Sequence, residues 1–379
     1  MENTAIILAL FKNFTTSVPM MRVFALFWIL LAAAAVLCSG VKFNHQNLEN
    51  NDMNRILSTS PDANNLTMIG NATVTGTLST CVKLSESVTC PNSLVPFYLY
   101  TSLNRERALI DTTNANWFAN NNFNITKKTV LLIHGYGTGD QSGGTPILRT
   151  AYLRTGEYNV INADFAILMK TPCFTESVYN LMAMSKCTAH MLAFLERSTG
   201  VKSVDVTCVG HSLGAHVCGI TANYLPTKLN RIIALDPAKP LIRRRSSGQR
   251  LDASDAVQVE VIHTNAGFLG LPGFVGTVDF CADGGFIQST CRSSRNRNTC
   301  SHSQSICIMA ESLFQSKRRT AVPCEKRCPY RRLSVLPGSN EIVGNSTSSS
   351  ASGMYCFNLS TAPYCNLTDP NYGDAHCCG

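Results

Sequence analysis

The sequence predicts an α/β fold, in which a mainly parallel β-sheet carries helices on both faces. From about residue 95 to residue 320, apolar runs alternate with helical patterns and with turns that contain Gly or Pro. Strands that alternate with helices build parallel sheets covered on both sides. The composition supports one large apolar core, because 45% of the 379 residues are hydrophobic and only 15% are charged.

Six apolar segments have the length and composition of β-strands, being rich in Val, Ile, Leu and Tyr. A longer segment, residues 176–198, places apolar side chains three and four positions apart, which is typical of an amphipathic helix. The expected strands are residues 95–101, 129–135, 158–165, 204–210, 231–236 and 257–264.

Residues 1–40 have the features of a leader. An apolar run from Val23 to Cys38 follows Arg22 and precedes Ser39 and Gly40, which is typical of a secretory signal peptide. A membrane anchor is the alternative, but a spanning helix needs about 20 apolar residues and this run is shorter. We therefore expect cleavage near the end of this run and a secreted, extracellular protein.

Two flanking segments differ from the central region in composition. Residues 41–94 are rich in Asn, Ser and Thr, which predicts a polar N-terminal segment without catalytic residues. Residues 321–379 are polar and cysteine-rich, which predicts a disulfide-linked, glycosylatable tail rather than a second domain. Residues 95–320 then form the main domain. Because the residues before the signal peptide are unusual, Met20 and Met21 are alternative starts to Met1.

Cysteine usage and glycosylation motifs agree with secretion. Seventeen cysteines without the paired Cys-x-x-Cys spacing of metal sites indicate disulfides in an oxidising compartment. The net charge of +8 is spread along the chain, and its one cluster, residues 243–245, favours a solvated loop over a site for anionic lipid. No nucleic-acid motif accompanies it. Six sequons outside the leader are potential glycosylation sites: Asn65, Asn71, Asn124, Asn345, Asn358 and Asn366.

The strongest local signal is VDVTCVGHSLGAHVCG, residues 204–219, in which a predicted strand runs through Gly-x-Ser-x-Gly into a helix. This strand-turn-helix context is that of a nucleophile elbow and disfavours a chance pentapeptide. The turn is so tight that it leaves no space for a β-carbon at positions 210 and 214, and both are glycine. It lifts the Ser212 hydroxyl above the sheet, over the N-terminus of the helix. Ser212 is therefore the predicted nucleophile.

A serine hydroxyl needs a base to take its proton and an acid to orient that base, and at such an elbow they follow in the order Ser, Asp, His. Asp236 ends the strand RIIALD and precedes a proline, so it is the expected acid. His263, His302 and His376 follow it. His302 lies on a loop before a predicted helix and is anchored by Cys300, whereas His263 ends a strand. Chain order alone leaves His302 and His263 both open.

Catalysis also needs two N–H donors at the point where a tetrahedral oxyanion forms. One is expected from Leu213, the residue after the serine. The other is expected from Tyr136 in the segment LLIHGYG, where a glycine lets the backbone approach the substrate.

These residues together resemble the pancreatic lipase family, secreted animal lipases and phospholipases with an α/β-hydrolase domain. The matches run in family order over more than half of the chain: FYLYT at 97, LLIHGYG at 131, NVINADF at 159, VGHSLGAH at 209, ALDPA at 234, RLDASDAVQVEVIHTN at 250, GTVDF at 276, GGFIQSTC at 284 and CSH at 300. The resemblance implies that Ser212, Asp236 and His302 form the catalytic triad. It places His263 on a strand before the one that carries Asp279.

The departures from the family concern the lid. The resemblance implies a disulfide between Cys291 and Cys300, but the loop between them is only RSSRNRNT, much shorter than the lid of triacylglycerol lipases. In its short lid the chain resembles insect-type members of the family and phospholipases A1. The lid is also basic, because it contains Arg292, Arg295 and Arg297, and these side chains suit a phosphate. The sequence after the catalytic histidine is too short for the family's C-terminal β-sandwich, so neither that domain nor a colipase partner is expected.

The sequence thus predicts a lipid carboxyl-ester hydrolase, phospholipase A1 or triacylglycerol lipase, that acts on lipid at a membrane or aggregate surface. It needs neither a cofactor nor a metal ion, and nucleic acid is not an expected partner. The alternative is a non-catalytic, yolk-type homologue that binds lipid on the same scaffold. The intact Ser-Asp-His set favours the enzyme.

Overall fold

The computed structural model describes residues 81–366, 368–369 and 371–378. The predicted signal peptide, the alternative start residues, most of the polar N-terminal segment and the sequons at Asn65 and Asn71 lie outside these residues.

Eleven strands of the described residues form one sheet, in the order β10-β9-β11-β8-β7-β6-β5-β3-β4-β1-β2. The seven neighbouring strands from β11 to β4 are parallel to one another. Beyond them, β9 and β10 at one end and β1 and β2 at the other end pair antiparallel with their neighbours. The strands are β1 Phe97–Tyr100, β2 Ala108–Leu109, β3 Lys128–Ile133, β4 Tyr158–Ala163, β5 Val206–His211, β6 Leu229–Leu235, β7 Ala256–His263, β8 Val278–Ala282, β9 Thr320–Pro323, β10 Glu341–Ile342 and β11 Gly353–Phe357. All six expected strands are present, as β1 and β3–β7.

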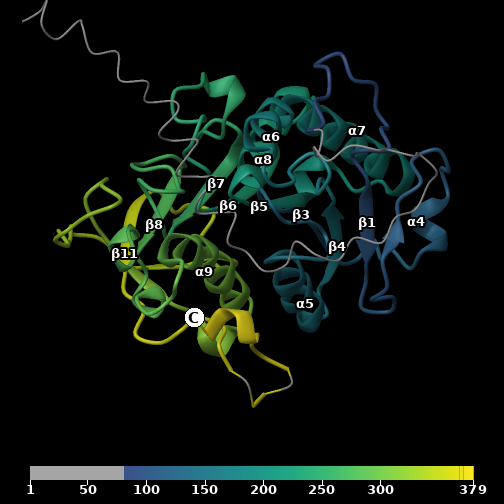
Figure 1. The fold of residues 1–379 in the computed structure, drawn as a ribbon. Helices are drawn as coiled ribbons and strands as arrows, with labels where there is room; N and C mark the ends of the chain where they lie inside the picture. Colours follow the sequence, from purple (N-terminus) through teal and green to yellow (C-terminus); the bar gives the residue numbers. More distant parts are fainter. Residues whose placement is uncertain (1–80, 367, 370, 379) are drawn as a thin grey trace, which may run out of the picture. The chain divides into compact units, whose positions relative to one another are not determined.

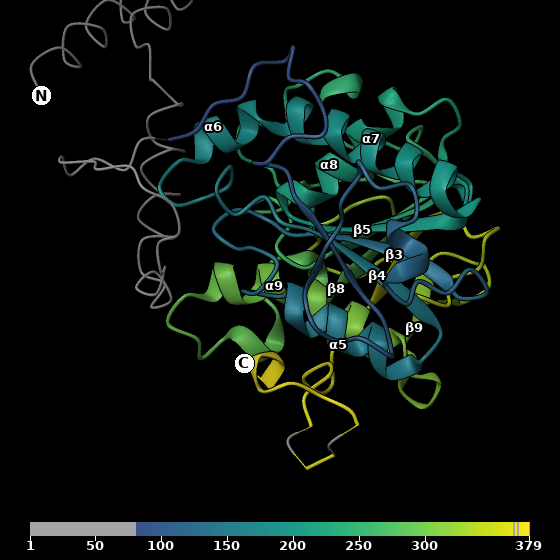
Figure 2. The same ribbon diagram turned by 90° about the vertical axis from the view of Figure 1, so that its right-hand side faces the viewer.

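Helices cover both faces of this sheet, as Figure 2 shows with α7 and α8 on one side and α5 and α9 on the other. Alternate residues of a strand face opposite layers. Leu131 and Ile133 of β3 pack in the layer of α7 and α8, and Val130 and Leu132 pack in the layer of α5 and α9. The helices are α4 Trp117–Asn120, α5 Thr145–Thr155, α6 Phe174–Tyr179, α7 Leu181–Thr199, α8 Leu213–Thr221 and α9 Arg297–Ser312. The predicted mainly parallel sheet between two helical layers is confirmed.

The expected single helix over residues 176–198 is two helices, α6 and α7, which meet at Asn180. The Asn180 side chain is buried and bonds outside the helix. Its Oδ1 accepts the N–H of Leu84 at 2.8 Å, and its Nδ2 donates to the carbonyl of Val82 at 2.9 Å. Apolar periodicity continues across this residue, so the break is invisible to a pattern of helical spacing.

Residues 321–379 differ from the expected tail, because they complete the main sheet. β11 lies between β8 and β9 and pairs with β8 in parallel over all five of its residues. Met354, Cys356 and Phe357 of this strand are buried. The strand is too short, and its surroundings too polar, for its apolar residues to stand out in the sequence. Figure 1 shows β11 beside β8, with α9 near them.

Eight disulfides pair sixteen cysteines in the part of the chain that the structure describes. Such a density is stable only in an oxidising compartment. The pairs are Cys81–Cys173, Cys90–Cys187, Cys208–Cys218, Cys281–Cys328, Cys291–Cys300, Cys307–Cys377, Cys324–Cys356 and Cys365–Cys378. Among the described residues, no helix has the length and apolar character that crossing a membrane requires.

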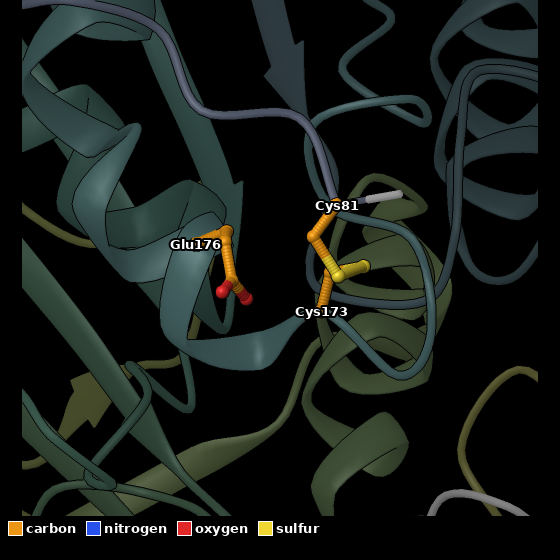
Figure 3. A group of neighbouring side chains, drawn as sticks. All are labelled: Cys81, Cys173 and Glu176. Carbon is orange, nitrogen blue, oxygen red and sulfur yellow. A yellow bond between two sulfur atoms is a disulfide. The ribbon is translucent and has the colours of Figure 1, made fainter. Parts of the chain in front are cut away.

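The first of these disulfides has a carboxylate beside it, since Glu176 lies close to both sulfur atoms of Cys81 and Cys173 (Figure 3). Three such groups could suggest a metal site. Cysteine ligates metals as the thiolate, however, and both sulfur atoms are consumed in the disulfide. The pair instead fixes the N-terminal part of the described chain to the start of α6.

Candidate active site

Ser212 occupies the turn between β5 and α8, at the carboxyl edge of the parallel strands. Its backbone angles, φ 55° and ψ −117°, are unfavourable for a residue with a side chain. A Cβ atom on Gly210 would lie 2.4 Å from the carbonyl oxygen of Gly214, and one on Gly214 would lie 2.2 Å from that of Ile133. Both flanking positions therefore require glycine, as the sequence predicted. Hydrogen bonds hold the turn, including one from the Ser212 N–H to Leu235 at 3.0 Å.

Asp236 follows β6 and points at His302. The distance from its Oδ2 to Nδ1 of His302 is 2.5 Å. Its Oδ1 accepts two backbone N–H groups, from Thr264 at 2.9 Å and from Asn265 at 3.0 Å. The carboxylate is fully buried and acts only as an acceptor, so Nδ1 of His302 donates to it. The other ring nitrogen, Nε2, is then free of its proton and available as a base.

His302 and Ser212 line one cavity of about 90 Å³. The walls are otherwise mostly apolar, which suits an acyl chain. Beside the two catalytic candidates, the lining comprises Tyr136, Thr138, Phe174, His211, Ala238, Pro240, Leu269, Thr299 and Ser303. Tyr136 packs edge-on against Phe174, with ring centroids 5.0 Å apart. Burial raises the pKa of Tyr136 to about 12, so its phenol is neutral at physiological pH.

His302 lies inside α9, not on a loop before a helix as expected. The helix begins at Arg297, and the side chain of Asn296 caps it by accepting the N–H of Thr299 at 3.3 Å. Asparagine is a favoured N-cap residue. This signal was present in the sequence, and it places His302 on a rigid element.

The segment after β3 lies against Ser212. A Cβ atom on Gly135 would lie 2.8 Å from Cβ of Ser212, so glycine permits this approach. The next residue, Tyr136, enters the cavity wall. Leu213 is the first residue of α8, and its N–H has no acceptor within the helix. The structure thus places Tyr136 and Leu213, the residues expected to supply the oxyanion donors, near Ser212.

His134 fixes the backbone of that segment. Its Nε2 accepts the N–H of Phe165 at 2.8 Å, and its Nδ1 donates to the carbonyl of Gly135 at 2.8 Å. Burial lowers the pKa of His134, which keeps the ring neutral and preserves this pair of bonds.

The two other histidine candidates contact different carboxylates. His263, at the end of β7, is buried and bonds through Nε2 to Asp279 at 2.9 Å and through Nδ1 to Leu271 at 3.1 Å. His376 is exposed and bonds to Asp374 at 3.0 Å. Both ring nitrogens of His263 are occupied, which leaves no free base there.

Sequence reasoning missed His211, the second residue of the Gly-x-Ser-x-Gly motif. Its ring centroid lies 4.6 Å from that of His302, and its Nε2 is 3.2 Å from the His302 carbonyl. Burial, and then the neighbouring His302, hold the pKa of His211 well below its usual range. A neutral ring at this point packs on the base without adding a competing charge. Its position inside the motif was the available signal.

The short lid is closed by the Cys291–Cys300 disulfide. Its three arginines, Arg292, Arg295 and Arg297, are exposed. At its end Thr299 lines the catalytic cavity, and Asn298 accepts a hydrogen bond from Asn265 at 3.2 Å. The loop expected to act as a lid therefore contacts both the cavity and the backbone that holds Asp236.

Four predicted sequons lie among the described residues. Asn124 and Asn358 are exposed, whereas Asn345 and Asn366 are half-buried. Asn345 accepts a hydrogen bond from the hydroxyl of Tyr158 at 3.3 Å.

Comparison with known proteins gives a family match over most of the chain. The family model described as Lipase matches residues 63–345. Lipase member H of Oryctolagus cuniculus is 31% identical over 245 residues, which are 62% of this chain and 53% of the relative. Phospholipase A1 member A of Bos taurus is 32% identical over 238 residues, 62% of this chain and 52% of the relative. Pancreatic lipase-related protein 2 of Cavia porcellus is 28% identical over 249 residues, which are 64% of this chain and 56% of the relative. This chain spans about half the length of these relatives.

Proposed function

This chain belongs to the pancreatic lipase family, and we propose that it is a secreted hydrolase of lipid carboxyl esters with Ser212 as its nucleophile. One observation carries the proposal. A fully buried carboxylate, Asp236, holds His302 at 2.5 Å in the cavity that Ser212 also lines. Such a set has no structural necessity in a sheet protein, and it places an acid, a base and a hydroxyl, the three groups that serine esterases use, at one cavity.

The reaction follows from these positions. Nε2 of His302 takes the proton from the Ser212 hydroxyl as the oxygen attacks the ester carbonyl carbon. The carbonyl oxygen becomes an oxyanion, and the N–H groups of Tyr136 and Leu213 stabilise it. When the tetrahedral species collapses, the protonated His302 gives its proton to the departing alkoxide. The alcohol leaves, and the acyl group remains on Ser212 as an ester.

The second half repeats the chemistry with water. His302 takes a proton from a water molecule, whose oxygen attacks the acyl carbon. The second tetrahedral species collapses to release the fatty acid, and the proton returns to Ser212. Asp236 keeps its negative charge throughout and stabilises the imidazolium that forms twice in the cycle. No step calls for a cofactor or a metal ion.

Two substrate classes fit this chemistry. The protein cleaves either a phospholipid, as a phospholipase A1 does, or an acylglycerol. The lid, residues 292–299, favours the phospholipid, because it is short and presents three exposed arginines that suit a phosphate. The relatives named phospholipase A1 and pancreatic lipase-related protein support both classes. Hydrolysis of a phosphatidylcholine and a triacylglycerol by the purified protein under matched conditions decides between them.

A non-catalytic lipid-binding protein is the second candidate, since the same scaffold can serve without chemistry. The strained Ser212 argues against it. Backbone strain of this kind costs about 1–3 kcal/mol, and it persists where a function needs it. Binding of lipid without hydrolysis of any ester by the purified protein would establish that candidate instead.

A further inference from the structure

A second hollow lies outside the catalytic cavity, at the hairpin that follows β9. We call residues 324–336 the basic hairpin; it closes where Cys324 pairs with Val335. The hollow has a volume of about 460 Å³. Its lining includes Phe286, Glu325, Arg327, Arg331, Arg332 and Leu333.

The charges at this hollow are unbalanced. Among the residues that the structure describes, the guanidinium groups of Arg327, Arg331 and Arg332 have neither an ion pair nor a hydrogen bond. The one acidic residue of this lining, Glu325, accepts a hydrogen bond from the hydroxyl of Ser334 at 2.9 Å. Lys326 adds a fourth cation and lies over the ring of Phe274, 4.4 Å from its centroid. Unpaired guanidinium groups around a concave surface attract phosphate-type anions.

Exposed apolar side chains accompany these cations. Leu333 is 41% exposed, Val335 57% and Leu336 44%. Phe268, on a neighbouring loop, is 46% exposed. Large apolar side chains next to unpaired cations match a lipid surface, where anionic head groups lie above acyl chains.

The basic hairpin contacts the loop between β7 and β8, which also reaches the catalytic residues. The Gly273 N–H donates to the carbonyl of Cys328 at 2.6 Å, and Pro329 lies against Gly267. In the same loop, Leu269 lines the catalytic cavity, and Gly270 packs directly on the Asp236 carboxylate. One loop therefore separates the hollow from the catalytic site.

We propose that the basic hairpin docks the protein on lipid surfaces that carry anionic phospholipids, with a head-group phosphate seated in the hollow. Docking there holds the cleft beside Ser212 close to the surface. This inference rests on the proposed function only in what docking is for, which is to bring the ester hydrolase to its substrate. Binding to the surface itself requires no hydrolysis.

Binding is measured by co-sedimentation of the full chain carrying Ser212→Ala, which removes turnover, with lipid vesicles. We expect it to bind phosphatidylcholine vesicles that contain phosphatidylglycerol, and pure phosphatidylcholine vesicles much less. The triple variant Arg327→Gln, Arg331→Gln, Arg332→Gln should lose about tenfold or more of the binding to anionic vesicles. The matched control is Lys128→Gln, Lys202→Gln, Lys228→Gln, which removes three exposed cations at the amino edge of the sheet. It should bind like the parent.

Two further measurements make the result specific. Raising the salt concentration should weaken parent binding to anionic vesicles, because charge attraction is screened. With Ser212 restored, the arginine variant should hydrolyse a soluble short-chain ester at the parental rate, which also shows that it folds. Equal binding of both triple variants to anionic vesicles, or equal binding of the parent to neutral vesicles, overturns the proposal.

A sulfated polysaccharide is the competing partner, and heparin serves as its probe. Loss of heparin binding with intact vesicle binding in the arginine variant would assign the hollow to that partner instead. A protein that binds anionic vesicles through the hairpin but hydrolyses no ester would leave docking standing and refute the proposed catalysis.

Discussion

Ser212, Asp236 and His302 lie on three different elements, and each is held by a different device. Ser212, the proposed nucleophile, is held by a strained turn. Asp236, the proposed acid, is held by two backbone N–H groups, and His302, the proposed base, by a capped helix. Rigid supports of this kind keep reacting groups within the small tolerance that catalysis allows.

Replacing the nucleophile tests the chemistry directly. We expect Ser212→Ala to lower kcat for ester hydrolysis by at least about 10⁴-fold without unfolding the protein, because removing the hydroxyl disturbs little packing. Activity on a chromogenic ester and a thermal melt measure both. A fully active or an unfolded variant would contradict the assignment.

The choice of base is tested by comparing two histidines. Since triad members act as a unit, His302→Ala should cost about as much activity as Ser212→Ala. His263→Ala instead removes a buried partner of Asp279, so it should lower the melting temperature rather than turnover by the folded protein. An inactive, folded His263→Ala beside an active His302→Ala would reverse the roles.

Asp255 should make the stability of the protein depend on pH. Burial raises the pKa of Asp255 to about 7, and its Oδ2 accepts the N–H of Asp252 at 2.8 Å. In the unfolded chain the group ionises near pH 4, so stability present below about pH 4 is lost as the pH rises towards 7. Asp255→Asn keeps an acceptor and cannot ionise. Its melting temperature should therefore fall by several degrees less than that of the parent between about pH 4 and about pH 8. Identical pH profiles would show that Asp255 ionises normally.

At the residue scale, the sequence was informative where chemistry restricts the residue type. Gly-x-Ser-x-Gly could be recognised because the turn tolerates no β-carbon at either glycine. The choice between His302 and His263 could not follow from chain order, because it depends on which carboxylate each ring meets across the fold. That pairing is a long-range contact that no local pattern encodes.

Among the elements, the proposed lid, residues 292–299, is the one that we expect to bear most directly on substrate choice. Its disulfide joins residues only nine positions apart, and it is continuous with α9. We expect so short a loop to leave the cavity beside Ser212 open. A long lid must move at a lipid surface before substrate enters, which makes activity rise steeply there. We expect hydrolysis of short-chain esters without such a jump at the solubility limit, measured by varying ester concentration across that limit.

The lid arginines should recognise the phosphate. Replacing Arg292, Arg295 and Arg297 with glutamine should lower kcat/KM for a monomeric short-chain phospholipid about tenfold and leave a neutral ester unchanged. The lysine triple variant described above is the control. Equal losses on both substrates would remove the lid as a head-group reader and favour a triacylglycerol lipase.

Elements were predictable in proportion to their length and apolar contrast. Five of the six expected strands, β3–β7, run through the buried parallel part of the sheet, where continuous apolar segments are required. β11 has five residues in a polar, cysteine-rich region and escaped prediction. The break at Asn180 escaped too, because a polar side chain that bonds across the fold leaves helical periodicity intact.

At the scale of the whole molecule, the proposed secretion has a direct test. We expect the secreted protein to begin near Ser39 or Gly40 and to carry N-glycans, with Asn124 and Asn358 occupied because both are exposed. Peptide mapping before and after enzymatic deglycosylation measures both. Retention of residues 20–38 in the released protein would indicate an anchored form.

The position of β11 has a consequence for how the chain is made. β8 is synthesised long before β11, its neighbour on one side. β9, which is made in between, does not pair with β8, because its partner is β11. While the ribosome adds the intervening residues, β8 presents an unpaired edge, the kind of surface on which nascent chains associate wrongly. The Cys281–Cys328 and Cys324–Cys356 bonds both join this region, and the second cannot form until β11 itself has emerged. Pairing of the β8 edge thus waits until residues 353–357 have emerged, and formation of the Cys324–Cys356 bond follows it.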